Sequence, residues 1–392
     1  MINIVEKQKC CGCQSCFNIC PKKCISMVPD EEGFLYPKID STKCIHCDLC
    51  NKVCPFLNSG GPKTIIPDTY AVINKNPEIR KKSSSGGFFP ALMENIFECG
   101  GVVYGVAFGK NLETCSHVRI TEKEQSVLLM GSKYIQSSIG RSFSDAKNDL
   151  ERGVLVLFSG TPCQIGGLKR FLGKEYSNLI TVALICHGVP SPNLWLKYLS
   201  AEEKRFRRKI DHVNFRDKKF GWEDYGIRKK GKGIDKFSDQ LQDPYLTMFQ
   251  KSYSLRPSCY ACSVKEQKPQ SDFTMGDFWG VDNVLSGFND GYGTSLVMVH
   301  TKKAQALFEK LKTSLYFRDV DYLSAISCNK AYLSSSLLPK EREEFFGDMN
   351  SLSFKELAKK YCRHSFSEGI KSYLKKTFFW RAFKTLKRRQ KQ

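Results

Sequence analysis

The sequence has no long apolar segment and no recognisable export signal. No run of apolar residues approaches eighteen, the length that a membrane-spanning helix needs. The N-terminal residues 1–6 lack the basic region and the apolar stretch of a signal peptide. These absences predict a cytoplasmic protein. Because the cytosol keeps thiols reduced, we expect the 18 cysteines to serve as metal ligands and not as a disulfide framework.

Acidic residues are scarce relative to basic ones. The 392 residues include 61 Lys and Arg against 40 Asp and Glu, which gives a formal net charge of +21. Such an excess is typical of proteins that meet nucleic acids or anionic membranes. One hypothesis is therefore a basic protein that binds nucleic acid and uses metal clusters only for its structure. The motifs described below favour two other hypotheses over it, so nucleic acid is disfavoured as a partner. The length and a hydrophobic content of 41% support two or three domains with real cores.

Two cysteine-rich segments near the N-terminus have the same spacing. Both read C-x-x-C-x-x-C-x-x-x-C-P, the pattern by which bacterial-type ferredoxins bind 4Fe-4S clusters. In this pattern the first three cysteines reach one cube and the fourth points to the other cube. We therefore predict two crossed ligand sets, the first being Cys10, Cys13, Cys16 and Cys54, and the second Cys44, Cys47, Cys50 and Cys20.

The rest of this segment fits a small α+β, ferredoxin-like domain over residues 1–58. Two β-like stretches, Ile25–Val28 and Phe34–Ile39, flank the turn sequence Asp-Glu-Glu-Gly and predict a hairpin. A zinc site is the alternative, but two complete repeats with both prolines favour clusters. Cys11 and Cys24 lie outside the pattern, and we expect them to be small packing residues beside the clusters.

A linker-like stretch, Ser59–Pro67, leads into a second segment, residues 67–150. Here a Ser/Gly loop, Ser83–Gly87, directly precedes a helical pattern. Free backbone N–H groups at such a loop bind phosphate, but an ordinary helix start fits the same residues. Lys133 and Tyr134 further along leave a similar choice, between cofactor contacts and a surface lysine beside a core tyrosine.

The third segment, residues 151–310, begins with two short apolar runs, Val154–Phe158 and Ile180–Ile185. Such runs are typical of strands buried on both faces of a parallel sheet. Residues 162–172 between them carry helix signals: proline at the first helical position and a capping box closed by glutamine at the third. This strand, helix, strand unit predicts an α/β domain with a largely parallel central sheet.

Cys163 and Cys186 follow the two predicted strands. Because parallel strands end at the same edge of a sheet, where such sheets bind ligands, we expect these two cysteines to be neighbours. A later loop adds Cys259 and Cys262, and four converging thiolates would bind a third 4Fe-4S cluster or a zinc ion. Two alternative roles are also consistent with the sequence: a redox-active dithiol formed by Cys259 and Cys262, and a nucleophile of low pKa at Cys163. A pair of Cys186 with His187 is disfavoured, since adjacent strand residues point to opposite faces.

The last segment, residues 311–392, shows mixed helical patterns and no motif with chemistry. Its final part, Lys371–Gln392, has nine Lys and Arg, no acidic residue and interleaved aromatic side chains. A basic helix with an aromatic face lies on anionic membrane surfaces, which would place the protein peripherally at the inner membrane face. A solvated tail whose aromatic side chains pack on the body is the alternative.

Short motifs between residues 70 and 310 resemble the beta-subunit family of coenzyme F-420 hydrogenases and dehydrogenases. They are Ser84–Gly87, Gly131–Ser137, Gly160–Gln164, Cys186–Pro192, Phe215–Lys218, Arg256–Cys262 and Gly276–Gly280. Members of that family hold FAD beside a 4Fe-4S cluster and pass hydride between a deazaflavin and the flavin. The resemblance implies a third cluster on Cys163, Cys186, Cys259 and Cys262. It also implies FAD contacts at Ser84, Ser85, Gly86, Gly87, Lys133 and Tyr134.

Together these parts predict an iron–sulfur flavoprotein oxidoreductase with FAD, two N-terminal 4Fe-4S clusters and a third one. A flavin accepts two electrons and releases them singly, whereas each cluster carries one. The chain would therefore connect a two-electron organic substrate, such as a deazaflavin, to a one-electron carrier protein. The alternative is an electron-transfer subunit without its own substrate that serves a partner reductase. Similar fused chains sometimes lie near polysaccharide genes, so this alternative extends to polysaccharide biosynthesis.

Overall fold

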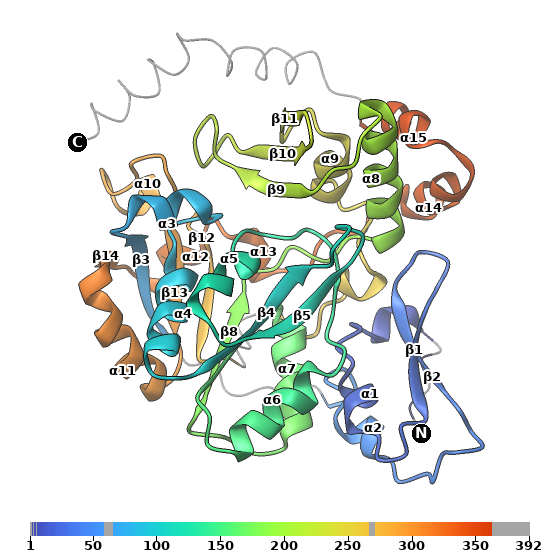
Figure 1. Ribbon diagram of the computed structural model, residues 1–392, viewed down its shortest axis with the longest axis horizontal. Helices are drawn as coiled ribbons and strands as arrows, with labels where there is room; N and C mark the ends of the chain where they lie inside the picture. Colours follow the sequence, from blue (N-terminus) through green and yellow to red (C-terminus); the bar gives the residue numbers. More distant parts are fainter. Residues whose placement is uncertain (1, 3, 5, 59–65, 266–270, 363–392) are drawn as a thin grey trace.

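The computed structural model describes residues 2, 4, 6–58, 66–265 and 271–362 (Figure 1). The predicted basic tail, Lys371–Gln392, and most of the linker Ser59–Pro67 lie outside the described residues. The described part comprises a small N-terminal unit, a large α/β body and a second, smaller sheet with its own helices (Figure 1). In the described part, no helix has both the length and the apolar character to cross a membrane.

The N-terminal unit is a hairpin packed with two short helices. Strands β1 and β2 pair antiparallel, with Ile25 opposite Ile39. The turn between them forms because Asp30 Oδ1 accepts hydrogen bonds from the backbone N–H groups of Glu32 and Phe34. The predicted α+β domain and its hairpin are thus confirmed. Its elements are η1 (Lys7–Lys9), α1 (Ser15–Ile19), β1 (Ile25–Pro29), β2 (Leu35–Ile39) and α2 (Leu49–Lys52).

A nine-stranded sheet forms the centre of the body, in the order β14-β3-β13-β12-β8-β7-β4-β5-β6. The four adjacent strands β12, β8, β7 and β4 are parallel. The predicted parallel sheet is confirmed at this centre, while antiparallel pairs join β12 to β13, β3 and β14 on one side and β4 to β5 on the other. The strands are β3 (Asp68–Asn74), β4 (Val102–Phe108), β5 (Cys115–Ile120), β6 (Ser137–Ser138), β7 (Val156–Gly160), β8 (Leu179–Leu184), β12 (Phe273–Asp277), β13 (Ser295–Val299) and β14 (Leu315–Asp319).

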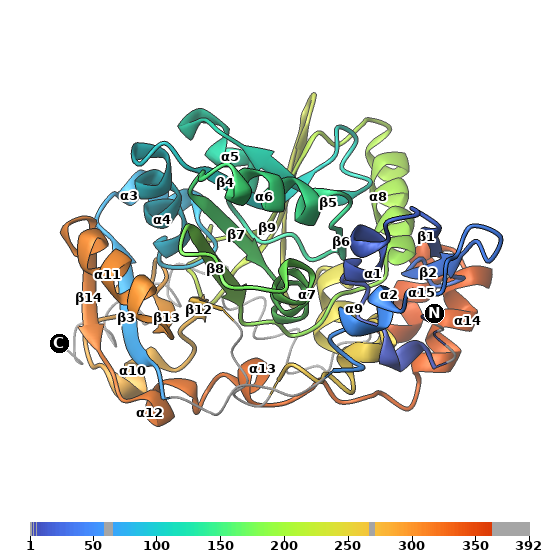
Figure 2. The same ribbon diagram turned by 90° about the horizontal axis from the view of Figure 1, so that it is seen from below.

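Helices cover both faces of this sheet, as Figure 2 shows from below. On one face, α4 (Phe88–Glu98) and α11 (Lys302–Leu311) pack against the sheet through one hydrophobic cluster. On the other face, α6 (Ser142–Glu151) and α7 (Pro162–Leu172) form a second cluster with β4, β7 and β8. Shorter helices complete the body: α3 (Pro77–Lys82), η2 (Lys123–Gln125), α5 (Ser126–Leu129), η3 (Pro257–Cys259), α10 (Val281–Val284), η4 (Lys312–Ser314), α12 (Tyr322–Ile326) and α13 (Lys330–Leu333).

A separate core lies around the smaller sheet, whose strand order is β11-β10-β9. Its strands pack with helices from distant parts of the sequence in one hydrophobic cluster that also includes Phe34 of the N-terminal unit. Lys197 Nζ on α8 donates to the carbonyl of Met349 on α14 at 2.7 Å, which ties the late helices to this layer. The elements are α8 (Pro192–Phe206), β9 (His212–Asp217), β10 (Gly226–Gly231), β11 (Ile234–Asp239), α9 (Pro244–Gln250), α14 (Arg342–Ser351) and α15 (Phe354–Tyr361).

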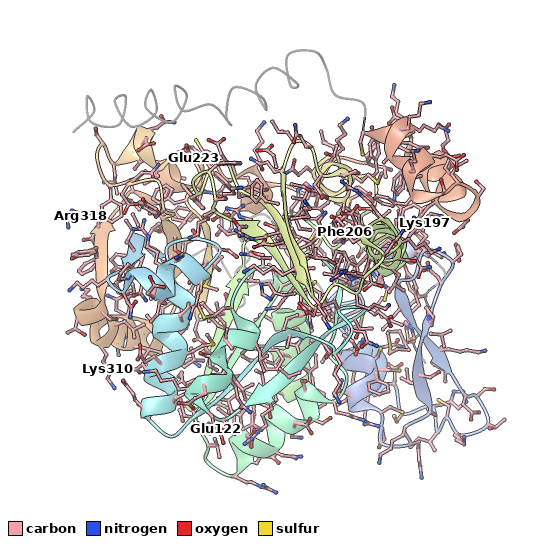
Figure 3. All side chains as sticks on the ribbon, turned by 45° about the horizontal axis from the view of Figure 1, so that its top comes forward. Glu122, Lys197, Phe206, Glu223, Lys310 and Arg318 are labelled. Carbon is pink, nitrogen blue, oxygen red and sulfur yellow. The ribbon has the colours of Figure 1, made fainter. Side chains whose placement is uncertain are left out.

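The large sheet takes strands from both sides of residue 150, and its edge strand β14 comes from beyond residue 310. The sheet therefore crosses two of the boundaries proposed from the sequence. Along β14 the exposed Arg318 side chain points away from the body (Figure 3). A charged residue on an edge strand opposes pairing with another chain.

Candidate functional site

A cavity in the N-terminal unit brings together the thiols predicted for the first cluster. Two residues of the first cysteine loop, Gly12 and Gln14, have left-handed backbone conformations, with φ of 68° and 62°, and curl the chain around the cavity. A Cβ atom at residue 12 would lie 2.8 Å from Gln136 Nε2, so the loop passes the body too closely for a side chain there. The thiols that line the cavity in the predicted set are Cys10, Cys13, Cys16 and Cys54.

A second cavity repeats this arrangement with the other predicted set. His46 and Asp48, at the positions equivalent to Gly12 and Gln14, have φ of 53° and 63°. The duplicated sequence therefore folds into duplicated backbone geometry. Cys24 also lines this cavity, and its Sγ atom lies 3.3 Å from the Sγ atom of Cys20. The lining thiols of the predicted set are Cys20, Cys44, Cys47 and Cys50.

The four cysteines of the body form a third group at one edge of the large sheet. Cys163 is the second residue of α7, Cys186 follows β8, and Cys259 ends η3 before Cys262. Burial raises the pKa of Cys186 to about 12, and the nearby Cys163 and Cys262 add to the rise although Lys265 opposes it. Burial also raises the pKa of Cys259, to which the other three thiols contribute. Cys163 and Cys186 are therefore close enough for the charge of Cys163 to raise the pKa of Cys186.

The electrostatics of this third group bear on what it can bind. Burial raises the pKa of Cys186, Cys259 and Cys262, whereas hydrogen bonds from Cys11 and Thr161 lower the pKa of Cys163. The three buried thiols with raised pKa resist ionisation unless positive charge compensates them, and iron or zinc supplies that charge. Within residues 2–58, 66–265 and 271–362, as far as they are described, no three His, Cys, Asp or Glu side chains are arranged to hold a single metal ion. In a 4Fe-4S cluster each thiolate binds an iron of its own. The donor set of four thiols fits such a cluster.

The first cavity and the third group are in direct contact. Helix α7, which carries Cys163, passes the first cysteine loop so closely that a Cβ atom at Gly167 would lie 3.0 Å from Cys13 Sγ. Hydrogen bonds of Cys11 with Cys13 and with Cys163 raise the pKa of Cys11 well above its usual value. Cys11 therefore lies beside the first predicted cluster, as the sequence suggested, and it also bridges to the third group.

Arg256 connects the same two regions from the other side. Its side chain is fully buried, and its guanidinium lies over the ring of Tyr36 at 4.2 Å. The Nε atom donates to the carbonyl of Cys10 at 2.7 Å, and Nη2 lies 3.5 Å from the Sγ atom of Cys10. Since Arg256 precedes Cys259 by three residues, it joins the ligand loop of the third group to that of the first. The sequence motif contained Arg256, but its role was not predicted.

The Ser84–Gly87 loop lies beside the Gly131–Tyr134 segment. Ser132 donates to Ser84 Oγ through its backbone N–H at 2.8 Å. The other polar groups of the loop bond to the body: Ser85 Oγ donates to the carbonyl of Thr294, and the backbone N–H of Gly86 donates to Ser295 Oγ. A Cβ atom at Gly86 would lie 2.2 Å from the carbonyl oxygen of Val72, so packing alone explains this glycine.

Lys133 and Tyr134 have partners within the protein. The Nζ atom of Lys133 donates to the carbonyls of Leu128, Met130 and Gly131, at 2.8, 3.0 and 3.3 Å, and so caps the end of α5. Burial lowers the pKa of Lys133 to about 8. The ring of Tyr134 stacks on Phe249 with centroids 4.9 Å apart. All three donors of the Lys133 ammonium are engaged, which leaves none for a phosphate in this conformation.

Polar groups that the sequence did not single out lie beside the Ser84–Gly87 loop and beside Tyr134. Lys218 Nζ donates to the carbonyl of Ser85 at 3.0 Å, and burial together with the charge of Arg80 lowers the pKa of Lys218 to about 7. The buried Arg216 lies 3.7 Å above the ring of Tyr225. Within the described residues, Arg216 Nε and Thr294 Oγ1 are buried without a hydrogen-bond partner. The Phe215–Lys218 motif was the only signal for the two basic residues.

Comparison with known families assigns two parts of the chain. Residues 9–58 match the 4Fe-4S dicluster domain. Residues 154–322 match the family described as the C-terminal part of the beta subunit of coenzyme F-420 hydrogenase/dehydrogenase. This segment of the chain is related to that beta subunit. The recognition made from the sequence motifs is thereby confirmed, and a 4Fe-4S-binding domain stands at the N-terminus of the beta-subunit segment. The beta-subunit match starts after the Ser84–Gly87 and Lys133–Tyr134 segments.

Curated relatives match the N-terminal domain. An uncharacterized polyferredoxin-like protein of Methanocaldococcus jannaschii is 37% identical over 59 residues, which cover 13% of this chain and 35% of that protein. An uncharacterized ferredoxin of the same organism is 38% identical over 52 residues, which cover 13% of this chain and 66% of that protein. The chain therefore spans about a third of the length of the polyferredoxin-like protein and just under two thirds of the length of the ferredoxin.

Among solved structures, the F-420-reducing NiFe hydrogenase complex from Methanosarcina barkeri, studied with xenon, contains a similar chain. The match has 17% sequence identity and a TM-score of 0.45 and covers 66% of this chain and 84% of that chain.

Proposed function

We propose that this chain is an iron–sulfur flavoprotein oxidoreductase that moves electrons between a two-electron organic substrate and a one-electron carrier protein. The observation that carries the proposal is the arrangement of twelve cysteines in three groups, two around separate cavities and the third in contact with the first. In this proposal each group binds one 4Fe-4S cluster. The ligands are Cys10, Cys13, Cys16 and Cys54; Cys20, Cys44, Cys47 and Cys50; and Cys163, Cys186, Cys259 and Cys262.

FAD belongs to the proposal because the body is related to the F-420 hydrogenase and dehydrogenase beta subunit. Bound FAD would supply the exchange between hydride and single electrons that clusters lack. The chain's own groups for it are Thr294, whose carbonyl accepts from Ser85, and Arg216 beside Tyr134; the buried Arg216 Nε and Thr294 Oγ1 have no partner among the described residues. Buried polar groups of this kind call for a partner, and a cofactor's phosphate or carbonyl oxygens accept from both. Lys133 would have to give up one of its carbonyl partners to join them.

The contacts between the groups support an order for electron movement. The contacts of Cys11 and Gly167 place the third group against the first cavity. Helix α1 connects the two cavities, because it carries Cys16 of the first cavity and is followed directly by Cys20 of the second. Electrons would therefore pass between the body and the first cavity, and between the first cavity and the second. The direction of net flow depends on the substrate and on the carrier.

Metal and flavin analysis of the anaerobically purified full chain tests the proposal. We expect about twelve irons, in keeping with three 4Fe-4S clusters, together with one FAD and a broad visible spectrum. A preparation with full iron but no flavin would contradict the flavoprotein assignment. About four irons per chain would contradict the cluster assignment.

A second candidate function is an electron-transfer subunit that lacks its own substrate and serves a partner reductase, including one of polysaccharide biosynthesis. The internal hydrogen bonds of Lys133 and of the Ser84–Gly87 loop favour it, because they satisfy groups that FAD would use. Incubation of the purified chain with reduced deazaflavin, NADH or NADPH separates the two functions. Bleaching of bound flavin by any of these supports the enzyme, whereas reduction by a carrier protein alone supports the relay.

A further inference from the structure

The two cavities of the N-terminal unit differ in their access to solvent. Around the first cavity, Cys13, Cys16 and Cys54 are all less than 9% exposed. Around the second, Cys47 and its neighbour His46 are exposed, and the side chain of Ile45 is 55% exposed. The chain that follows β2 and forms this second cavity lies at the outer end of the unit, away from the body (Figure 1).

This difference defines one end of the electron path. The first cavity contacts the body at Gly167 and through Arg256, so the body covers its approach. The wall of the second cavity that residues 45–48 form is exposed to solvent. Because one-electron transfer between proteins requires close approach of the two centres, this exposed wall is the approach that suits a carrier protein.

The surface around the second cavity is basic. Lys22 lines the cavity itself. In the described part of the chain, no ion pair is formed by the exposed lysines Lys22, Lys23 and Lys52, while Lys43 pairs with Asp40 at 2.9 Å. Asp48 is an exposed acid of the same loop. As far as the structure describes it, this surface has lysines without ion-pair partners around an exposed apolar residue, Ile45. Such a surface is complementary to a partner protein that has carboxylates around a small apolar patch.

We propose that this outer surface, defined by Lys22, Lys23, Ile45, His46 and Lys52, is the docking site for a small, acidic one-electron carrier protein. The proposal deepens the proposed function and rests on a cluster in the second cavity. Each encounter transfers one electron: the carrier is reduced by one electron, the chain is oxidised by one, and no bond or proton changes. Two encounters balance one two-electron oxidation of an organic substrate, and the reverse direction balances in the same way.

The test uses the full holo chain and does not need its flavin or substrate. The chain is reduced with stoichiometric dithionite and mixed in a stopped-flow instrument with an oxidised, acidic plant-type 2Fe-2S ferredoxin. The test variant is Lys22→Glu/Lys52→Glu. The matched control, Lys232→Glu/Lys236→Glu, makes the same charge change at exposed lysines of the β10–β11 hairpin, far from the N-terminal unit (Figure 1). Iron analysis establishes that both variants keep their clusters.

The docking site predicts a bimolecular rate that falls as salt is raised, because the attraction is between surface charges. At low salt the test variant slows transfer by roughly tenfold while the control stays within about twofold. A basic cytochrome c used as acceptor should show the opposite change in the test variant. Equal effects of the two variants, or no effect of the test variant, overturn the docking site. Those results leave the proposed function intact, since its failure appears separately as missing iron or flavin.

Discussion

Substitution of Arg256 should change the reduction potential of the cluster proposed for the first cavity. The guanidinium is fully buried and lies 3.5 Å from Cys10 Sγ. A positive charge there stabilises the reduced cluster, which carries one more negative charge than the oxidised one. Arg256→Gln removes the charge but keeps a hydrogen-bond donor for the carbonyl of Cys10. The expected result is a lower potential for this cluster.

The magnitude follows from Coulomb's law. The electron added on reduction is spread over the cluster, so the relevant separation is larger than the contact with Cys10 Sγ, at about 6 Å. With an effective dielectric constant of about 20 the interaction is about 3 kcal/mol. A tenfold change in a one-electron equilibrium corresponds to about 59 mV, so the expected decrease is on the order of 100 mV.

The assay is a redox titration of the full chain followed by low-temperature EPR. Arg256→Lys is the matched variant because it keeps the charge and loses only the planar geometry of the donors, so its potential should stay near that of the unmodified chain. If Arg256→Gln retains its full iron content and every cluster keeps its original potential, Arg256 does not act on the first cluster. Loss of iron in both variants would instead show that Arg256 mainly holds the two ligand loops in place.

Three further outcomes are expected. Cys163→Ser should lower the iron content from about twelve to about eight and leave the EPR signals of the N-terminal clusters, whereas full iron would contradict the third ligand set. Burial lowers the pKa of His117 to about 4, so between pH 6.5 and 4 only the unfolded chain binds this proton, and the free energy of unfolding decreases as the pH is lowered. In urea unfolding across that range, the His117→Asn variant should therefore lose about 3 kcal/mol less of its free energy of unfolding than the unmodified chain. The same pH dependence in both proteins would contradict this role of His117. Lys218 Nζ donates to the carbonyls of Arg80, Ser85 and Tyr292 and so holds the Ser84–Gly87 loop in place, so Lys218→Met should reduce the flavin content, while the exposed neighbour substitution Lys219→Met should not.

The sequence predicts the parts of the site that depend on neighbouring residues. Helix α7 begins at Pro162 as expected, and the side chain of Gln164 accepts from the backbone N–H of Thr161 at 3.0 Å. The helix ends where Gly173 adopts a φ of 69°. These signals act within one or two helical turns, so the residues themselves contain the necessary information. The cysteine spacing has the same local character, and its two sets line two separate cavities.

Long-range features could not be predicted in this way. Strand β13 is buried along its whole length, a pattern typical of parallel strands, but it is antiparallel to both β12 and β3. Burial on both faces determines the apolar composition of a strand and leaves its direction open. The engagement of Lys133 by the carbonyls at the end of α5 was equally hidden, because it depends on how the chain turns between residues 128 and 133.

The contacts between the N-terminal unit and the body explain why a fused ferredoxin-like domain suits electron transfer. Arg342 forms a two-bond ion pair with the buried carboxylate of Glu32 and also donates to the carbonyl of Leu255. Ser191 Oγ donates to the carbonyl of Glu32 at 2.5 Å. A buried ion pair with these extra hydrogen bonds is costly to separate, since each charge would be left unpaired. The unit is therefore held at a fixed position, with its first cavity against the third cysteine group, and electron transfer between them requires no encounter of separate proteins.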